Sequence, residues 1–203
     1  MKRIFQKTYY LIFFALLLAF NGVRAQQNVI GMTASLANVQ QIPLQKLDGK
    51  KMFVNLKARR LQIFVFLSPE CPLSRNYTIV LNNIYKKFGE NIQISGIIPG
   101  QAYSAQELQD YVKAYNILFP VMIDSQKEFS NYVKATVTPE VVVTDQSGLQ
   151  VYRGAIDDWV LDLGKKKLKP EQHYLQQAIE QYLQGQPVTV KHTIPKGCLI
   201  NEF

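Results

Sequence analysis

The chain has few of the residues on which metal clusters and disulfide scaffolds depend. Its 203 residues include two cysteines and two histidines. These numbers exclude a zinc-finger array and a disulfide-dense small scaffold. No internal repeat of about 20 to 50 residues is visible, which excludes a repeat architecture. The apolar fraction of 47% is too high for a disordered chain and is typical of a globular domain with a hydrophobic core.

Acidic residues are missing from the first 25 positions, and this absence explains much of the net charge. The whole chain carries 23 Lys and Arg against 15 Asp and Glu, a net charge of +8. Four of the basic residues precede residue 26, so 19 face the 15 acids in the rest of the chain, a net charge of +4. Such a charge does not form a phosphate-binding face, and we expect no nucleic-acid partner.

Residues 1–25 have the three parts of a secretory signal peptide. The segment starts with basic residues, Tyr9–Phe20 is an uninterrupted apolar run, and Val23-Arg24-Ala25 is a small-x-small cleavage site. The apolar run is shorter than the about 20 residues that span a bilayer, and no other segment approaches that length. We expect cleavage after Ala25, with an uncleaved N-terminal anchor as the alternative. The mature protein is then exported, periplasmic or secreted, without stable membrane insertion, in a compartment where disulfides persist.

Beyond residue 25 the order of apolar and polar segments predicts an α/β fold. We expect a leader over 26–40, one domain over 41–185 and an irregular tail over 186–203. The expected order is a β-hairpin, then βαβαβα, then ββα, in a mostly parallel sheet with one antiparallel hairpin near the end. The expected elements are a hairpin over 42–56, strands over 63–67, 92–98 and 119–123, helices over 72–88, 104–115 and 128–135, a hairpin over 140–153, and a last helix opened by Pro170.

Cys71 carries the clearest chemical signal in the chain. It follows an apolar strand and precedes Pro72, a residue suited to the first position of a helix. A thiol at a helix N-terminus faces unpaired N–H groups and the positive end of the helix dipole, which favour the thiolate. The carboxylate of Glu70 opposes that effect. Cys71 is either a reactive nucleophile or a small buried apolar residue, and its place at a strand-to-helix turn favours the nucleophile.

Three segments are informative in combination: Phe66-Leu-Ser-Pro-Glu-Cys71-Pro, Val137-Thr-Pro139-Glu and Val142–Gly154. Together they resemble the thioredoxin fold in its redoxin branch, which has a helix and strand inserted centrally, here at about 100–123. This branch includes thioredoxin-like cytochrome-maturation proteins and peroxiredoxins. The resemblance implies that Thr138–Pro139 is a cis peptide that lies against Cys71 and offers backbone groups to a thiol substrate. Glu70 and Ser74, on either side of Cys71, complete the expected substrate contacts. The resemblance covers roughly 40–184.

The C-terminal third contains the pattern RG-x-IDD, DLGK, H and GC-x-I, as Arg153-Gly-Ala-Ile-Asp-Asp158, Asp162-Leu-Gly-Lys165, His173 and Gly197-Cys198-Leu-Ile200. In this pattern it is similar to a group of exported bacterial redoxin-domain proteins of the alkyl hydroperoxide reductase–thiol-specific antioxidant superfamily. We expect a protein or small-molecule thiol or disulfide as the partner. Asp157 and Asp158 are expected to form a solvated turn, with an acid pair as the alternative.

The site departs from the motifs of the two main families of this fold. Thioredoxins have Cys-x-x-Cys, and Ser74 stands at the second cysteine, so the helix does not close its own disulfide. Peroxiredoxins resemble Pro-x-x-x-Thr/Ser-x-x-Cys with a distant arginine. Here Ser68 holds the hydroxyl position, but the proline is absent and Pro139 stands near the place of the arginine. Neither activity is expected in its usual form.

Cys198 offers a partner for Cys71. Two cysteines in an exported chain usually pair or react. The tail from Gln186 is long enough to fold back, because eleven extended residues reach about 35 Å. One hypothesis is that Cys71 attacks a disulfide or an oxidant and that Cys198 resolves the adduct. Another is a permanent disulfide that holds the tail and contributes at most about 4–5 kcal/mol. A third is that no bond forms.

These patterns favour thiol–disulfide exchange by an exported redoxin, with Cys71 and Cys198 as the catalytic pair. A thiol peroxidase, in which Cys71 becomes a sulfenic acid, is the second hypothesis. The third is a binding or metal-handling module. Ligand softness permits a copper site from the cysteines and His173 or His192, although the sequence has no local metal-ligand spacing. We expect no metal and no other cofactor.

Overall fold

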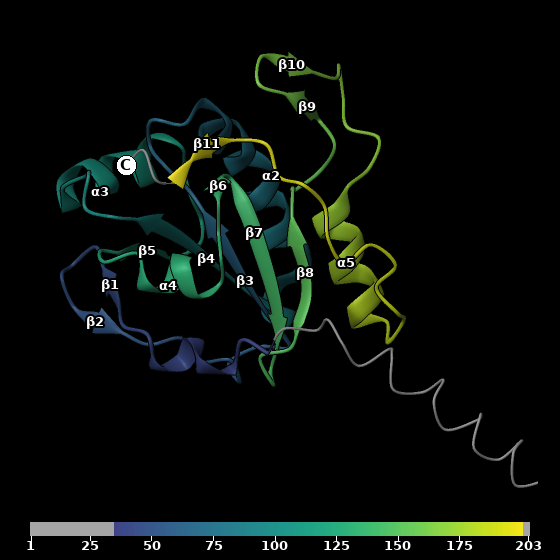
Figure 1. Ribbon diagram of the computed structural model, residues 1–203, viewed down its shortest axis with the longest axis horizontal. Helices are drawn as coiled ribbons and strands as arrows, with labels where there is room; N and C mark the ends of the chain where they lie inside the picture. Colours follow the sequence, from purple (N-terminus) through teal and green to yellow (C-terminus); the bar gives the residue numbers. More distant parts are fainter. Residues whose placement is uncertain (1–34, 201–203) are drawn as a thin grey trace, which may run out of the picture. The chain divides into compact units, whose positions relative to one another are not determined.

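A mixed seven-stranded sheet lies at the centre of the protein (Figure 1). The computed structural model describes residues 35–200. The strand order in the sheet is β2-β1-β5-β4-β3-β7-β8. These strands are β1 (Leu44–Lys46), β2 (Lys51–Met52), β3 (Leu61–Phe66), β4 (Ile92–Pro99), β5 (Val121–Asp124), β7 (Glu140–Asp145) and β8 (Gln150–Gly154). Outside the sheet lie β6 (Val137–Thr138), β9 (Val160–Asp162), β10 (Lys165–Lys166), β11 (Cys198–Leu199), the 3₁₀ helices η1 (Ala37–Gln41) and η2 (Gly89–Asn91), and the helices α2 (Pro72–Phe88), α3 (Ala105–Ala114), α4 (Glu128–Tyr132) and α5 (Tyr174–Leu183).

Strand β3 is an interior strand of the sheet, and all six of its residues are buried, as expected from its unbroken apolar sequence. It pairs in parallel with β4 and antiparallel with β7. The expectation of a mostly parallel sheet is wrong. Only β3–β4 and β4–β5 are parallel among the six pairings of this sheet, because the hairpins β1–β2 and β7–β8 both join its centre in antiparallel orientation.

Helices cover both faces of the sheet, and the alternation of side chains along each strand divides the core in two. Ile63 and Val65 face the core formed with α2, α3 and α5. Phe64 and Phe66 face the other core, formed with η1 and α4. The expected N-terminal hairpin is present as β1–β2, and the expected central insertion is present as α3 and β5. Helix α3 begins with the capping box that Ser104 and Glu107 predict.

Two boundaries differ from the expected ones. Pro170 does not open the last helix, which begins at Tyr174. The carboxylate of Asp158 accepts the N–H groups of residues 171 and 172 and thereby holds that segment outside the helix. At the other end, Leu36 and Val39 are buried, so the C-terminal part of the expected leader contributes to the core.

The predicted signal peptide over 1–25 lies outside the described residues. Between residues 35 and 200, no helix combines the length and the apolar character that crossing a membrane requires.

The sequence analysis expects an irregular C-terminal tail, but the tail contains a strand. Its strand β11 pairs antiparallel with β6 (Figure 1). Further upstream, His192 forms a parallel bridge with Arg153 of β8. At the end of the described chain, Ile200 is 3% exposed and belongs to the core that contains Phe66. The tail is therefore part of the folded domain.

Candidate functional site

Cys71 lies where the chain passes from the buried strand β3 to the 17-residue helix α2. It is the N-cap residue, Pro72 follows at the first helical position, and only 1% of Cys71 is exposed. Its backbone N–H donates to the carbonyl oxygen of Ser68 at 3.2 Å, a bond that turns the chain from β3 into the helix. The first N–H groups of a helix favour negative charge at this position. The expected placement of Cys71 at a strand-to-helix turn is confirmed.

A cis peptide bond contacts this thiol. The Thr138–Pro139 bond is cis, as the sequence resemblance implies. The Sγ atom of Cys71 donates to the carbonyl oxygen of Thr138 at 3.0 Å, and Thr138 is buried. The cis-proline segment and the start of α2 therefore form one site.

The tail brings Cys198 to the same site. In the pairing of β11 with β6, Cys198 lies opposite Thr138. Its Sγ atom is 2.8 Å from that of Cys71, and both residues are thiols in the structure. Gly197 makes this approach possible, because a Cβ atom there would overlap the carbonyl group of Thr138. Sequence analysis includes Gly197 in a family pattern, but the reason for a glycine is visible only in the structure.

Contacts on both sides of Cys198 hold the tail in place without a bond between the sulfurs. Upstream, the N–H of Thr193 donates to the carbonyl oxygen of Arg153 at 3.1 Å. Downstream, the N–H of Ile200 donates to the carbonyl oxygen of Thr136 at 3.0 Å, and its side chain is buried. Backbone pairing and apolar burial thus position Cys198 in the thiol form of the protein.

Hydrogen bonds favour the thiolate of Cys71. Burial raises the pKa of this thiol, but hydrogen bonds from Cys198 and Ser74 outweigh burial, so that the pKa is lowered from its ordinary value. Ser74 is fully buried at the position that a second cysteine occupies in Cys-x-x-Cys. Glu70 lies on the exposed turn before Cys71. The arrangement gives Cys71 a stabilised thiolate, which can attack a sulfur or leave one.

Replacing Ser74 by Ala is expected to raise the pKa of Cys71, because the hydroxyl that helps to stabilise the thiolate is lost. The thiolate then forms at higher pH, and its fraction at neutral pH falls. The ultraviolet absorbance of the thiolate as a function of pH measures this shift, with Cys71→Ser as the blank. The control is Ser68→Ala, which removes a nearby hydroxyl that pairs with the Tyr103 hydroxyl at 2.9 Å and does not contribute to the lowered pKa of Cys71. An equal shift in both variants would contradict a specific role of Ser74.

Sequence analysis missed a buried ion pair behind the cis-proline. Glu140 is 1% exposed, and one of its carboxylate oxygens accepts from the Arg153 guanidinium at 2.6 Å. The other oxygen accepts the backbone N–H of Thr136 at 2.8 Å and its hydroxyl at 3.0 Å. The pair thereby ties both ends of the cis-proline segment together. The available signal was an acidic residue directly before Val141–Val143, because a charge at the start of a buried strand needs a partner.

Asp157 and Asp158 form neither an acid pair nor a solvated turn. Asp157 is 4% exposed, and one oxygen accepts the Tyr77 hydroxyl at 2.6 Å and the Trp159 N–H at 2.9 Å. Asp158 accepts from the Lys167 ammonium at 2.6 Å. Both carboxylates therefore organise the segment between β8 and α5.

The described residues offer no ligand set for a metal ion. Between residues 35 and 200, no group of three or more His, Cys, Asp or Glu side chains could hold one. His173 is the exposed N-cap residue of α5, and His192 is exposed in the tail. The copper-site hypothesis, which requires a histidine with both cysteines, therefore has no such cluster in this part of the chain.

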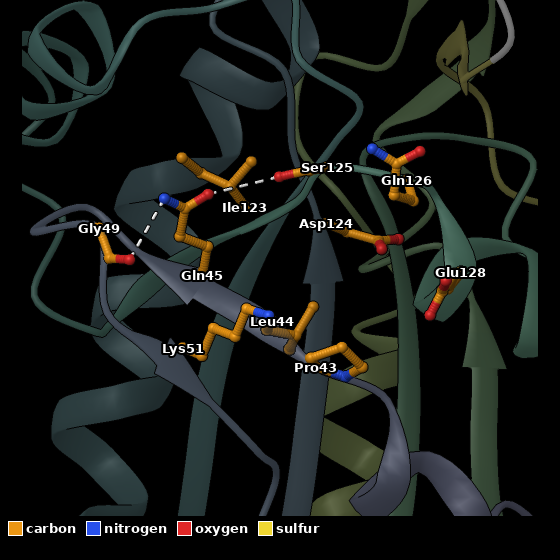
Figure 2. A pocket seen from close by; sticks show the side chains of 10 residues that line it. All are labelled: Pro43, Leu44, Gln45, Gly49, Lys51, Ile123, Asp124, Ser125, Gln126 and Glu128. Carbon is orange, nitrogen blue, oxygen red and sulfur yellow. Dashed lines mark hydrogen bonds between the residues drawn. The ribbon is translucent and has the colours of Figure 1, made fainter.

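A separate cavity of about 250 Å³ lies between the β1–β2 hairpin and β5 (Figure 2). In this view Gln45 bridges the carbonyl oxygen of Gly49 and the Ser125 hydroxyl. The carboxylate of Asp124 accepts the N–H groups of Phe129 and Ser130. None of the ten residues drawn is a cysteine or a histidine, so the thiol site lies elsewhere.

Comparison with known proteins bears on the fold. No family model and no curated protein matches the chain. A hypothetical protein from Sinorhizobium meliloti 1021 is similar in structure, with a TM-score of 0.68 and 23% identity over 78% of this chain and 88% of that one. An uncharacterized conserved protein from Geobacillus kaustophilus has a TM-score of 0.69 and 22% identity over 84% and 93%. The thioredoxin domain of a thiol-disulfide oxidoreductase from Bacteroides vulgatus has a TM-score of 0.50 and 17% identity over 60% and 89%. The chain has a thioredoxin-like α/β fold with a central helix–strand insertion and an N-terminal β-hairpin.

Proposed function

We propose that this protein is an exported thiol–disulfide oxidoreductase in which Cys71 is the nucleophile and Cys198 is the resolving cysteine. The observation that carries the proposal is the 2.8 Å contact between their sulfur atoms. The two residues are 127 positions apart, so local chain geometry does not account for this contact. It depends on the antiparallel pairing of β11 with β6, which places Cys198 opposite Thr138.

In the exchange reaction Cys71 attacks the substrate, and Cys198 then attacks Cys71. Cys71 is 1% exposed while the tail is docked, so the tail moves aside when the substrate binds. The Cys71 thiolate then attacks one sulfur of a substrate disulfide, a mixed disulfide forms at Cys71, and the other substrate sulfur leaves as a thiolate that takes a proton from solvent. Cys198 loses its proton to solvent and attacks the Cys71 sulfur. This step forms the Cys71–Cys198 disulfide and releases the second substrate thiolate. The substrate gains two electrons and the protein loses two, and the reverse sequence oxidises a substrate dithiol.

Two features support a redox pair over a permanent disulfide. Thr193 and Ile200 hold the tail through hydrogen bonds and burial, so the fold does not need a covalent staple there. The lowered pKa of Cys71 suits a thiol that attacks and leaves, a property that an inert disulfide does not require. Thr138, Pro139, Glu70 and Ser74 are proposed to contact the substrate around Cys71.

The test measures the redox cycle directly. The protein, purified from the exported fraction of the host, is reduced, mixed with insulin as the disulfide substrate, alkylated and mapped by mass spectrometry. We expect one Cys71–Cys198 bond per substrate disulfide reduced, a loss of about 100-fold or more in Cys71→Ser, and a stable mixed disulfide at Cys71 in Cys198→Ser.

The reduction potential separates the redox pair from the staple. We expect a value above about −300 mV, in the range of disulfides that exchange. A bond that resists mild reductant would assign Cys198 a structural role. Two thiols that persist after exposure to an oxidant would exclude the resolving role of Cys198.

A further inference from the structure

We propose that the Cys71–Cys198 disulfide is reduced back to its two thiols by a small thiol that carries a carboxylate and attacks Cys198. The thiol enters through a pocket between α2 and the β9–β10 hairpin, in which Lys165 and Lys166 bind the carboxylate. This inference rests on the proposed redox role of the cysteine pair. It adds the sulfur that is attacked, the path to it and the chemical class of the reductant.

Access distinguishes the two sulfurs. Cys71 is 1% exposed with the tail in place, whereas Cys198 is partly exposed. Cys198 lines the pocket, and Cys71 is not among the lining residues. An incoming thiolate must reach the sulfur that it attacks. It can therefore reach Cys198 from the pocket, but it reaches Cys71 only if the tail is displaced.

The identity of the leaving group favours the same sulfur. In an exchange reaction, the thiol with the lower pKa leaves faster. Attack on Cys198 expels Cys71 as a thiolate, and Ser74 together with the N-terminal turn of α2 stabilises that thiolate. Attack on Cys71 would expel Cys198, which does not lie at a helix N-terminus. Access and chemistry thus select Cys198 as the point of attack.

The pocket has the size and lining of a site for a small amphipathic molecule. Its volume is about 330 Å³, near the lower end of the range for small-molecule sites, about 300–1,000 Å³. Apolar side chains of the hairpin, including Trp159 and Leu163, face α2 across it and can contact the carbon chain of a thiol. The α2 residues that line it are Pro72, Leu73 and Asn76.

The charges of the pocket favour an anionic ligand. Lys165 and Lys166 line it together with one acidic residue, Asp162. The carboxylate of Asp162 accepts the backbone N–H of Leu163 at 2.9 Å and so caps the turn of the hairpin. The Lys166 ammonium lies 5.2 Å from the centre of the Trp159 ring. Two ammonium groups against one carboxylate leave the pocket positively charged.

Hydrogen bonds hold the base of the β9–β10 hairpin, which forms one wall of the pocket. Burial raises the pKa of Asp158, but the Gln172 N–H and the Lys167 ammonium outweigh it and hold the pKa at about 2. Asp158 is therefore charged at neutral pH. The Lys167 N–H also donates to the carbonyl oxygen of Trp159 at 2.8 Å, across the hairpin. Figure 1 shows this hairpin as an arm between β8 and α5.

The regenerating reaction consumes two thiols. The first thiolate attacks the sulfur of Cys198, a mixed disulfide forms there, the Cys71–Cys198 bond breaks, and Cys71 leaves as a thiolate. A second thiolate attacks the ligand sulfur of the mixed disulfide and releases Cys198, which takes a proton from solvent. The ligand leaves as its disulfide. The ligand loses two electrons and the cysteine pair gains them.

The experiment compares three thiols of different charge on the disulfide form of the whole protein. Mercaptopropionate is anionic, mercaptoethanol is neutral and cysteamine is cationic, and each rate is expressed per thiolate. We expect mercaptopropionate to open the disulfide about 3- to 10-fold faster than mercaptoethanol, and cysteamine to be slowest. The double variant Lys165→Gln/Lys166→Gln should remove this order. The control Lys57→Gln/Lys169→Gln removes the same charge from exposed positions outside the pocket and should keep it.

Rapid acid quenching and peptide mapping identify the sulfur that is attacked. We expect the mercaptopropionate adduct on the Cys198 peptide. An adduct on the Cys71 peptide, or rates that do not depend on charge, would overturn this inference and leave the proposed function intact. A disulfide that resists all three thiols would overturn the proposed function as well.

Discussion

Replacing Gly197 by Val is expected to prevent rapid formation of the Cys71–Cys198 disulfide. A Cβ atom at residue 197 overlaps the carbonyl group of Thr138, which is backbone and cannot rotate away. Strand β11 must then separate from β6, and Cys198 moves away from its partner. A displacement of about 1 Å at a reacting centre can cost about 100-fold in rate. We expect at least that loss, measured by alkylation and mass spectrometry after addition of an oxidant.

The matched control is Leu199→Val, in strand β11 two residues after Gly197. Leu199 is 52% exposed, so the substitution places a β-branched residue in β11 without a clash. Its rate of disulfide formation should stay within about twofold of the unmodified protein. If Gly197→Val forms the disulfide as fast as Leu199→Val, the close backbone approach does not position Cys198.

Replacing Glu140 by Gln is expected to destabilise the fold by about 3 kcal/mol, because it leaves the Arg153 guanidinium partly buried without its counter-charge. The Arg153 side chain is 19% exposed and that of Glu140 is 2% exposed. Urea unfolding, followed by circular dichroism, measures the change in free energy of unfolding.

The comparison variant is Glu180→Gln, which removes one partner of a more exposed ion pair. Lys87 and Glu180 have side chains that are 50% and 34% exposed. The expected cost is below about 0.5 kcal/mol, as for surface ion pairs in general. Similar losses of unfolding free energy in the two variants would show that the Glu140–Arg153 pair stabilises the fold no more than an exposed ion pair does.

Local sequence signals predict the elements around the site well. The buried apolar run of β3, the proline at the start of α2 and the glycine after its end place Cys71 correctly, because each acts within a few residues. The capping box at Ser104 predicts the start of α3 for the same reason. A cis bond at Thr138–Pro139 is implied only by the family resemblance, since the dipeptide itself is usually trans.

Features that depend on distant partners were not predictable in the same way. An apolar run does not show whether its neighbour is parallel, which explains the wrong expectation for the sheet. Ile200 lies in a polar tail, and its burial depends on a core formed by residues far away in the chain. The sequence leaves open whether Cys71 and Cys198 form a redox pair, a permanent disulfide or no bond, and it does not show that their sulfurs meet. Their contact depends on the pairing of β11 with β6.

The position of the second cysteine on the tail couples redox chemistry to conformational stability. In Cys-x-x-Cys both sulfurs belong to one helix turn, whereas here Cys198 meets Cys71 only while Thr193 and Ile200 keep the tail docked. The effective concentration of Cys198 therefore sets how stable the disulfide is relative to the two thiols. Each tenfold decrease in that concentration raises the reduction potential by about 30 mV. Substitutions that weaken the docking of the tail, without touching either sulfur, thus make the protein a stronger oxidant.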